Sequence, residues 1–235
     1  MEFAGITSGR FEMTQDNRKD GTSTQKFVVA GWLAIVSAFL LLPEIGLSLM
    51  ADISSAHPRL DFAVMPFLIP VTFAEVGLGA YALYMFKNML NQRYDFHKTD
   101  NLIYAIIIGS LLLGILGIAA RMMPDMIVAN GIPNLLPDDL TDITLLSKVA
   151  SGLIMFTVGF PVSILTIIFA YKLLQLPGTL NGLVKPLAYA FIASSVCFLT
   201  FILAFLGMAI MIAATVILGI ALIRSGEADE DLEFI

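Results

Sequence analysis

Two carboxyl side chains stand inside long apolar runs, where such groups are rare. Glu75 lies near the middle of one run, with Thr72 one helical turn before it, and Glu44 follows Pro43 late in an earlier run. A charged carboxyl group at the bilayer centre costs about 2.5 kcal/mol or more, so Glu75 is expected to face other helices. We therefore treat Glu75 as a candidate proton relay or cation site, with Thr72 and Glu44 as candidate partners. The structural alternatives are a neutral, hydrogen-bonded Glu75 and a Glu44 at headgroup level.

The remaining reactive side chains do not form a recognisable catalytic set. No Ser-His-Asp arrangement, metal-ligand helix motif or phosphate-binding glycine loop occurs in the sequence. His57 and His97 lie in polar loops, whereas a bundle that binds b-type haem needs axial ligands at membrane depth. Cys197, the single cysteine, lies in an apolar run and is expected to pack. We expect a protein that is not an enzyme and that binds no metal or other cofactor.

Composition assigns the chain to the membrane. Of its 235 residues, 58% are hydrophobic and 14% are charged, whereas soluble domains carry about 25% charged residues. So few charged side chains cannot form a water-soluble surface around so apolar a chain. The composition therefore excludes soluble enzymes, nucleic-acid binders and disordered regulators. The fold class that follows is all-α: a polytopic transmembrane helical bundle whose one certain partner is the lipid bilayer.

The elements that must position these side chains are apolar segments of about 20 residues, the length that crosses a bilayer as a helix. Pro70 and Pro161 are expected to kink their helices. The last run is long enough for one projecting helix or for two spans folded at Gly207; its length favours two spans, but its lack of polar turn residues favours one. The predicted segments are a flexible cytosolic lead (1–26), a transmembrane domain (27–224) with spans at 27–50, 62–86, 102–120, 149–174 and 187–223, and an acidic tail (225–235).

Orientation follows from the positions of lysine and arginine. Nine of these residues fall in the lead and in the loops after the second and fourth spans, and three fall in the alternate loops. Positive loops stay in the cytosol, so we predict a cytosolic N-terminus, five or six spans and a location in the bacterial inner membrane. If the last run is a hairpin, Arg224 joins the nine and the tail is cytosolic too.

The loop after the second span and the end of the chain carry the most specific patterns. The loop contains Leu83–Asn88 and then Asp95 and Phe96, and the chain ends on an apolar helix, Gly226 and an acidic tail that finishes with apolar residues. Both features resemble an uncharacterised family of small bacterial multi-pass membrane proteins, often encoded beside a helix-turn-helix regulator. The resemblance implies a regulatory or sensory protein partner. The candidate partner contacts are Phe86, Phe96, Asp229, Glu230 and Asp231.

These observations favour a non-enzymatic membrane protein with a regulatory, sensory or assembly role, acting through its cytosolic loops and its tail. A protein partner or a second copy of the chain is then expected, and direct binding of nucleic acid is not. Two alternatives stay open: a small proton- or cation-coupled carrier or channel that uses Glu75, and an accessory subunit of a larger membrane complex.

Overall fold

The computed structural model describes residues 9–54, 58–129, 149–176, 182–200 and 202–230, and 94% of these residues are helical, with no strand among them. Five helices are long and apolar enough to cross a membrane: Gln25–Ser48, Pro66–Tyr94, His97–Met122, Val149–Leu174 and Ala204–Glu227. The predicted class, a polytopic helical membrane bundle, is confirmed at this level. The elements are α1 (Gly9–Ser54), α2 (Pro58–Tyr94), the 3-10 turn η1 (His97–Thr99), α3 (Asp100–Ala129), the π-helical turn η2 (Met155–Gly159), α5 (Phe160–Leu174), α6 (Val184–Leu199) and α7 (Ala204–Glu230).

The long last apolar run forms two helices. α6 ends at Leu199 and α7 begins at Ala204, and the two helices pack against each other as a hairpin. The break lies before Gly207, which instead allows the start of α7 to approach α6: a Cβ atom on Gly207 would lie 3.1 Å from the Cβ atom of Cys197. Cys197 is buried there, as its apolar surroundings predicted. Of the two alternatives for residues 187–223, the hairpin is the one that forms.

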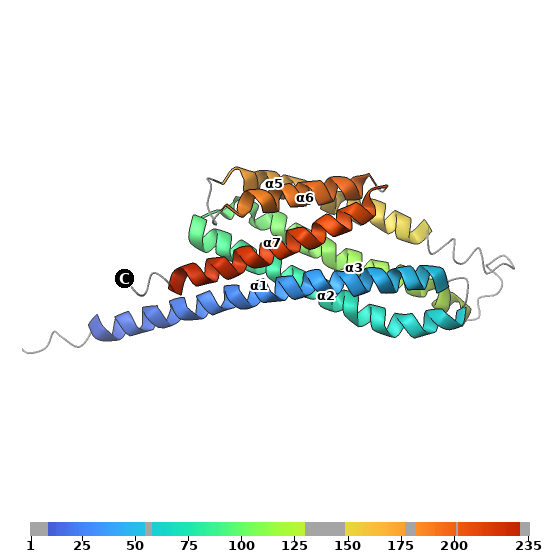
Figure 1. Cartoon of the computed structure of the whole chain (residues 1–235), viewed down its shortest axis with the longest axis horizontal. Coiled ribbons are helices and arrows are strands. Elements are labelled where there is room, and N and C mark those ends of the chain that lie inside the picture. Colours follow the sequence, from blue (N-terminus) through green and yellow to red (C-terminus); the bar gives the residue numbers. More distant parts are fainter. Residues whose placement is uncertain (1–8, 55–57, 130–148, 177–181, 201, 231–235) are drawn as a thin grey trace, which may run out of the picture.

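The hairpin brings both ends of the described chain to the same end of the bundle (Figure 1). We call this end the base. It contains the end of α2, the start of α3, the end of α5, the start of α6 and the end of α7. The opposite, far end carries the end of α1 and the α6–α7 turn. Within the bundle, α1 packs most extensively against α2 and α7, and α5 packs against α6 (Figure 1). The base is formed by residues 91–100, 172–176, 184–185 and 223–230.

Small residues hold α1 and α7 together. Ala30, Ala34 and Ala38 are all fully buried on α1. At the crossing, a Cβ atom on Gly31 would lie 2.5 Å from the main-chain oxygen of Gly219, and a Cβ atom on Gly219 would lie 2.7 Å from the main-chain oxygen of Gly31. Close backbone approach over small residues is the usual way in which membrane helices associate.

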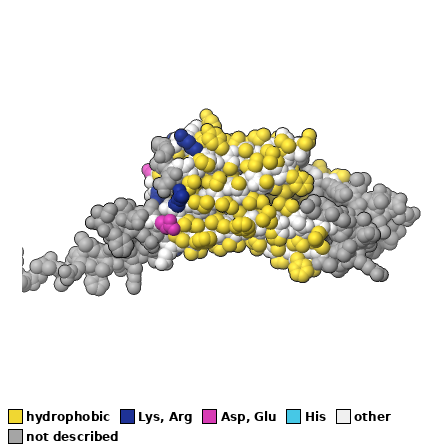
Figure 2. All heavy atoms as spheres, in the orientation of Figure 1, with side chains coloured by type: hydrophobic (Ala, Val, Ile, Leu, Met, Phe, Trp, Pro, Cys, Tyr) yellow, Lys and Arg dark blue, Asp and Glu magenta, His cyan; other side chains and the backbone are white. Residues whose placement is uncertain are grey.

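The surface of the bundle is largely apolar. Figure 2 shows hydrophobic side chains over most of the described body, with lysine, arginine and acidic side chains gathered at the base. Large apolar side chains such as Trp32, Phe39 and Phe67 are more than half exposed. Such a surface is stable in contact with lipid and would aggregate in water.

Helix extends into both segments that flank the predicted transmembrane domain. The sequence predicted a flexible lead over residues 1–26, but residues 9–26 belong to α1, which is 46 residues long. Extending an existing helix adds one hydrogen bond per residue, so the span itself removes the cost of starting a helix there. At the other end, α7 continues to Glu230, inside the predicted acidic tail.

Candidate functional site

The intramembrane glutamates lie between α1 and α2. The hydroxyl of Thr72 donates a hydrogen bond to Oε1 of Glu44 over 2.9 Å, and the hydroxyl of Ser37 donates to the main-chain oxygen of Glu75 over 3.2 Å. The side chains of Glu44 and Glu75 are half-buried. The structure thus brings Glu44 and Thr72 into contact, but Thr72 bonds to Glu44 and not to Glu75.

A small cavity lies near these glutamates. A cavity of about 20 Å³, enough for one water molecule, lies between α2 and α3 beside Thr72, and neither Glu44 nor Glu75 lines it. Among the described residues, no group of three or more His, Cys, Asp or Glu side chains is placed to hold a metal ion. The α1–α2 contact therefore has the geometry of a polar helix–helix contact.

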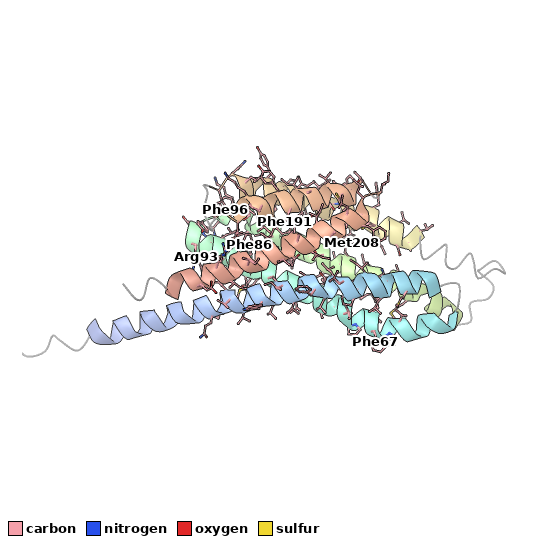
Figure 3. All side chains as sticks on the ribbon, in the orientation of Figure 1. Phe67, Phe86, Arg93, Phe96, Phe191 and Met208 are labelled. Atoms are coloured by element: carbon pink, nitrogen blue, oxygen red, sulfur yellow. The ribbon has the colours of Figure 1, made fainter. Side chains whose placement is uncertain are left out.

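Phe86 lies in the centre of the core. Its side chain is fully buried, and its ring meets that of Phe169 edge-on with the centroids 6.5 Å apart. Phe191 continues the row, with its centroid 6.1 Å from that of Phe169. Phe86 therefore joins α2 to α5. Because the ring is fully buried and α2 continues past it to Tyr94, Phe86 is not on a surface that a partner can reach. Figure 3 shows Phe86 and Phe191 inside the bundle.

Three of the other predicted partner contacts lie at the base. Phe96 is half-buried and packs against the core from the loop between α2 and α3, next to Asp95, whose φ is +49° (Figure 3). Asp229 and Glu230 belong to the last turn of α7. Asp231 lies outside the described residues.

Hydrogen bonds join the helix ends at the base. The guanidinium group of Arg93 donates to the main-chain oxygen of Ser225, which ties the end of α2 to the end of α7. Lys172 on α5 donates to the main-chain oxygen of Lys98 over 3.2 Å. The amide of Asn91 donates to the carboxylate of Asp100 over 2.9 Å. These contacts connect α2, α3, α5 and α7 in one polar network.

Three buried oxygen atoms belong to the same region. Oδ1 of Asn91, Oγ1 of Thr99 and Oγ of Ser225 have no hydrogen-bond partner among the described residues. Buried polar atoms are normally satisfied by a protein group or by water, so these three oxygens mark the base as the polar end of the bundle.

Lys87 forms an aromatic-lined polar contact that the sequence analysis missed. Its side chain is only 8% exposed, and its Nζ atom donates to the hydroxyl of Tyr104 over 2.7 Å. The same nitrogen lies 4.5 Å from the ring centre of Tyr104 and 5.2 Å from that of Tyr84, a cation–π arrangement. The sequence placed Lys87 at the start of a loop. A possible signal was the spacing of Tyr84 and Lys87, which puts them on one face of a helix.

We expect Tyr104→Phe to lower the free energy of unfolding by about 1.5–3 kcal/mol, because the hydrogen bond that it removes involves a buried charge. The ring and its cation–π contact remain. Chemical unfolding of the purified protein in detergent measures the change. The matched control is Tyr189→Phe at a side chain that is 61% exposed. In a Lys87→Met background the effect of Tyr104→Phe should disappear. An equal effect in both backgrounds would contradict the Lys87–Tyr104 bond.

We expect Arg93→Ala to loosen the end of α7 locally. Loss of a hydrogen bond from a charged donor costs about 1.5–3 kcal/mol, and the main-chain oxygen of Ser225 loses its donor from α2. Hydrogen–deuterium exchange should become faster at residues 223–230 and stay unchanged at Gly31. Arg224→Ala, at an exposed position of the same turn, is the control. Equal acceleration in both variants would show that Arg93 does not hold this turn.

A second interhelical cavity lies between α2, α3, α5, α6 and α7. The cavity has a volume of about 280 Å³ and a mostly apolar lining, with Met211 contributed by α7. η2 forms part of its wall and comes directly before Pro161, which the sequence predicted to kink the helix. Because proline lacks an N–H group and crowds the preceding turn, a local change of helix type is an expected response. The lining residues are Leu83, Ile106, Ser110, Leu113, Met155, Gly159, Val162, Ser163, Thr166, Phe169, Phe191, Ser194, Ser195, Phe198 and Met211.

Comparison with known proteins finds no match: no family model, no curated protein and no solved structure is significantly similar to this chain. The resemblance to the small bacterial membrane family stays a prediction from the quoted motifs.

Proposed function

We propose that the chain is a non-enzymatic membrane protein with a regulatory or sensory role, and that the base is its output surface. The observation that carries this proposal is the bond from Arg93 to the main-chain oxygen of Ser225. It joins the end of α2, which the sequence placed in the loop after the second span, to the end of α7 near the acidic tail, and the sequence assigned candidate partner contacts to that loop and to the tail. A signal that moves α7 would change both segments together.

We propose further that the base faces the cytosol. With residues 187–223 folded as a hairpin, ten of the thirteen lysine and arginine residues lie in the lead, in the sequence-predicted loops after the second and fourth spans, or at position 224, and three belong to the alternate loops. This asymmetry supports an N-terminus and a tail on the cytosolic side. A reporter that is active on one side only, fused after Ile235, tests the orientation, and a signal from the external side would overturn it.

The regulatory role is tested by photo-cross-linking in cells. A cross-linking residue is placed at Gln92 or Glu227, both exposed at the base, and at Val36 or Phe73, both exposed on the apolar face. We expect an adduct of one defined mass from the base positions only. Adducts from the apolar face only would support the accessory-subunit alternative, in which the chain binds a larger complex within the membrane. Absence of adducts from all four positions would contradict a protein partner.

The second candidate function is a carrier or channel. The hydrogen bond between Thr72 and Glu44 favours this candidate, because the bond places an acceptor carboxylate inside the α1–α2 contact. In that case Glu75→Gln should abolish proton or cation flux into proteoliposomes without changing the unfolding midpoint. Flux that survives Glu75→Gln, or that is absent from the parent protein, would remove this candidate.

A further inference from the structure

The cavity of about 280 Å³ has walls that suit an apolar ligand. Five hydroxyl side chains line it, and at least three of them are already engaged: Ser163 donates to the main-chain oxygen of Gly159, Thr166 to that of Val162, and Ser194 to that of Phe191. No charged side chain is present in the lining. A polar ligand would leave water and find few free partners here, at a cost of about 1–3 kcal/mol for each unpaired group.

The shape of the helices keeps this space open. Gly159 closes the π-helical turn, and a Cβ atom there would lie 2.8 Å from the sulfur of Met155. On the facing helix, Gly109 has no side chain, and a Cβ atom there would collide with Val162. Any side chain at Gly159 or Gly109 would therefore push the cavity wall, formed in part by Met155 and Val162, out of place.

The volume and position of the cavity further restrict the class of ligand that can fit. Its volume is almost twice the 150 Å³ or so that accommodates one benzene molecule in a dry protein cavity, and it lies just below the usual range of sites for drug-sized ligands. It is not fully enclosed: Met155, Phe198 and Met211 in its lining are half-exposed. Beside η2, Leu153 and Phe156 are about 60% exposed on the apolar face of the bundle. Methionine side chains adapt to flexible apolar ligands.

We propose that this cavity binds the end of one alkyl chain, supplied by a membrane lipid or by a free fatty acid. The chain enters from the apolar face beside η2 and ends against Phe169 and Phe191. Binding of an alkyl chain requires neither a base that faces the cytosol nor a regulatory role. A protein that binds an alkyl chain without any partner would satisfy the proposal.

The test uses tryptophan fluorescence in the full chain. The single tryptophan is removed by Trp32→Phe, and a reporter is introduced by Phe198→Trp at the cavity wall. One probe is a fatty acid with bromine on its terminal carbon, added in detergent. The other is phosphatidylcholine with brominated chains, in nanodiscs. We expect saturable quenching of the cavity reporter. Saturation by the fatty acid identifies a free chain as ligand, and saturation by the lipid alone identifies a lipid chain.

Variants that fill the cavity supply the control. Ser163→Leu and Ser195→Leu, from different helices, should each raise the half-saturating concentration of the brominated probe at least tenfold. Ser151→Leu, which lies on the same span as Ser163 but outside the cavity lining, should not change this concentration. If one of these two leucine variants does not fold, the other still tests the proposal. Quenching that rises without saturation, and equally for a reporter at Val36 on the outer face, would overturn the proposal.

Discussion

Gly31→Ala is expected to lower the free energy of unfolding by about 1–3 kcal/mol, although alanine normally favours a helix over glycine. The new Cβ atom would lie 2.5 Å from the main-chain oxygen of Gly219 and 2.6 Å from Cγ1 of Ile223. The first of these atoms is backbone and cannot turn aside, so α1 and α7 must separate. Unfolding of the purified protein in mixed micelles measures the change.

Gly46→Ala is the matched control, because Gly46 also lies on α1 and a Cβ atom there meets nothing within 4 Å. It should leave stability unchanged or raise it by up to about 1 kcal/mol, as helix propensity predicts. The two substitutions are chemically identical and lie on one helix, so opposite signs isolate the helix crossing. Equal effects would show that α1 and α7 are not held at the distance described.

Phe169→Ala is expected to cost about 3 kcal/mol or more of unfolding free energy. Its ring is 1% exposed and contacts both Phe86 and Phe191, so truncation breaks the aromatic row that joins α2, α5 and α6. The same ring lines the cavity, and its loss merges the vacated space with the existing one. Neighbouring side chains then have too little volume to fill the gap. Thermal unfolding in detergent measures the loss.

Phe156→Ala serves as the comparison, because this side chain is 61% exposed on the outside of the same transmembrane segment. Its expected cost is below about 1 kcal/mol, since lipid replaces the contacts that the ring makes. Phe169→Leu should lie between the two alanine variants. A cost for Phe156→Ala that equals the cost for Phe169→Ala would contradict the assignment of Phe169 to the core.

The apolar segments were easier to predict than the last turn. Apolar runs of about 20 residues indicated four of the five long helices, and the fifth, Ala204–Glu227, lies in the long last run for which one helix or a hairpin stayed open. The α6–α7 turn was ambiguous because it contains no glycine, proline or asparagine between Thr200 and Leu203. The structure satisfies backbone groups locally instead: the hydroxyl of Thr200 donates to the main-chain oxygen of Cys197 over 2.8 Å. Ile202 is 91% exposed, which suits a turn surrounded by lipid.

Candidate sites were harder to predict because buried and lipid-facing positions are equally apolar. Depth in the membrane is readable from the chain, and on that basis Glu75 was expected to face other helices; Glu44 and Glu75 are half-buried and Thr72 is buried, and their role as a site stays a prediction. The direction in which a side chain points around its helix cannot be read from the sequence in the same way. Phe86 was therefore assigned to a surface and lies in the core, and the Lys87–Tyr104 contact was missed.

The short α6 gives the bundle one side that is thinner than the rest. Its 16 residues rise only about 24 Å, less than the roughly 30 Å of a bilayer's hydrocarbon core, and the α6–α7 turn stops short of the far ends of α1 and α2 (Figure 1). Lipids beside α6 must shorten to match it, whereas lipids beside α1 need not. Such hydrophobic mismatch costs fractions of a kcal/mol per Å and is relieved when short faces meet. We therefore expect the bundle to deform its membrane unevenly, most strongly beside α6.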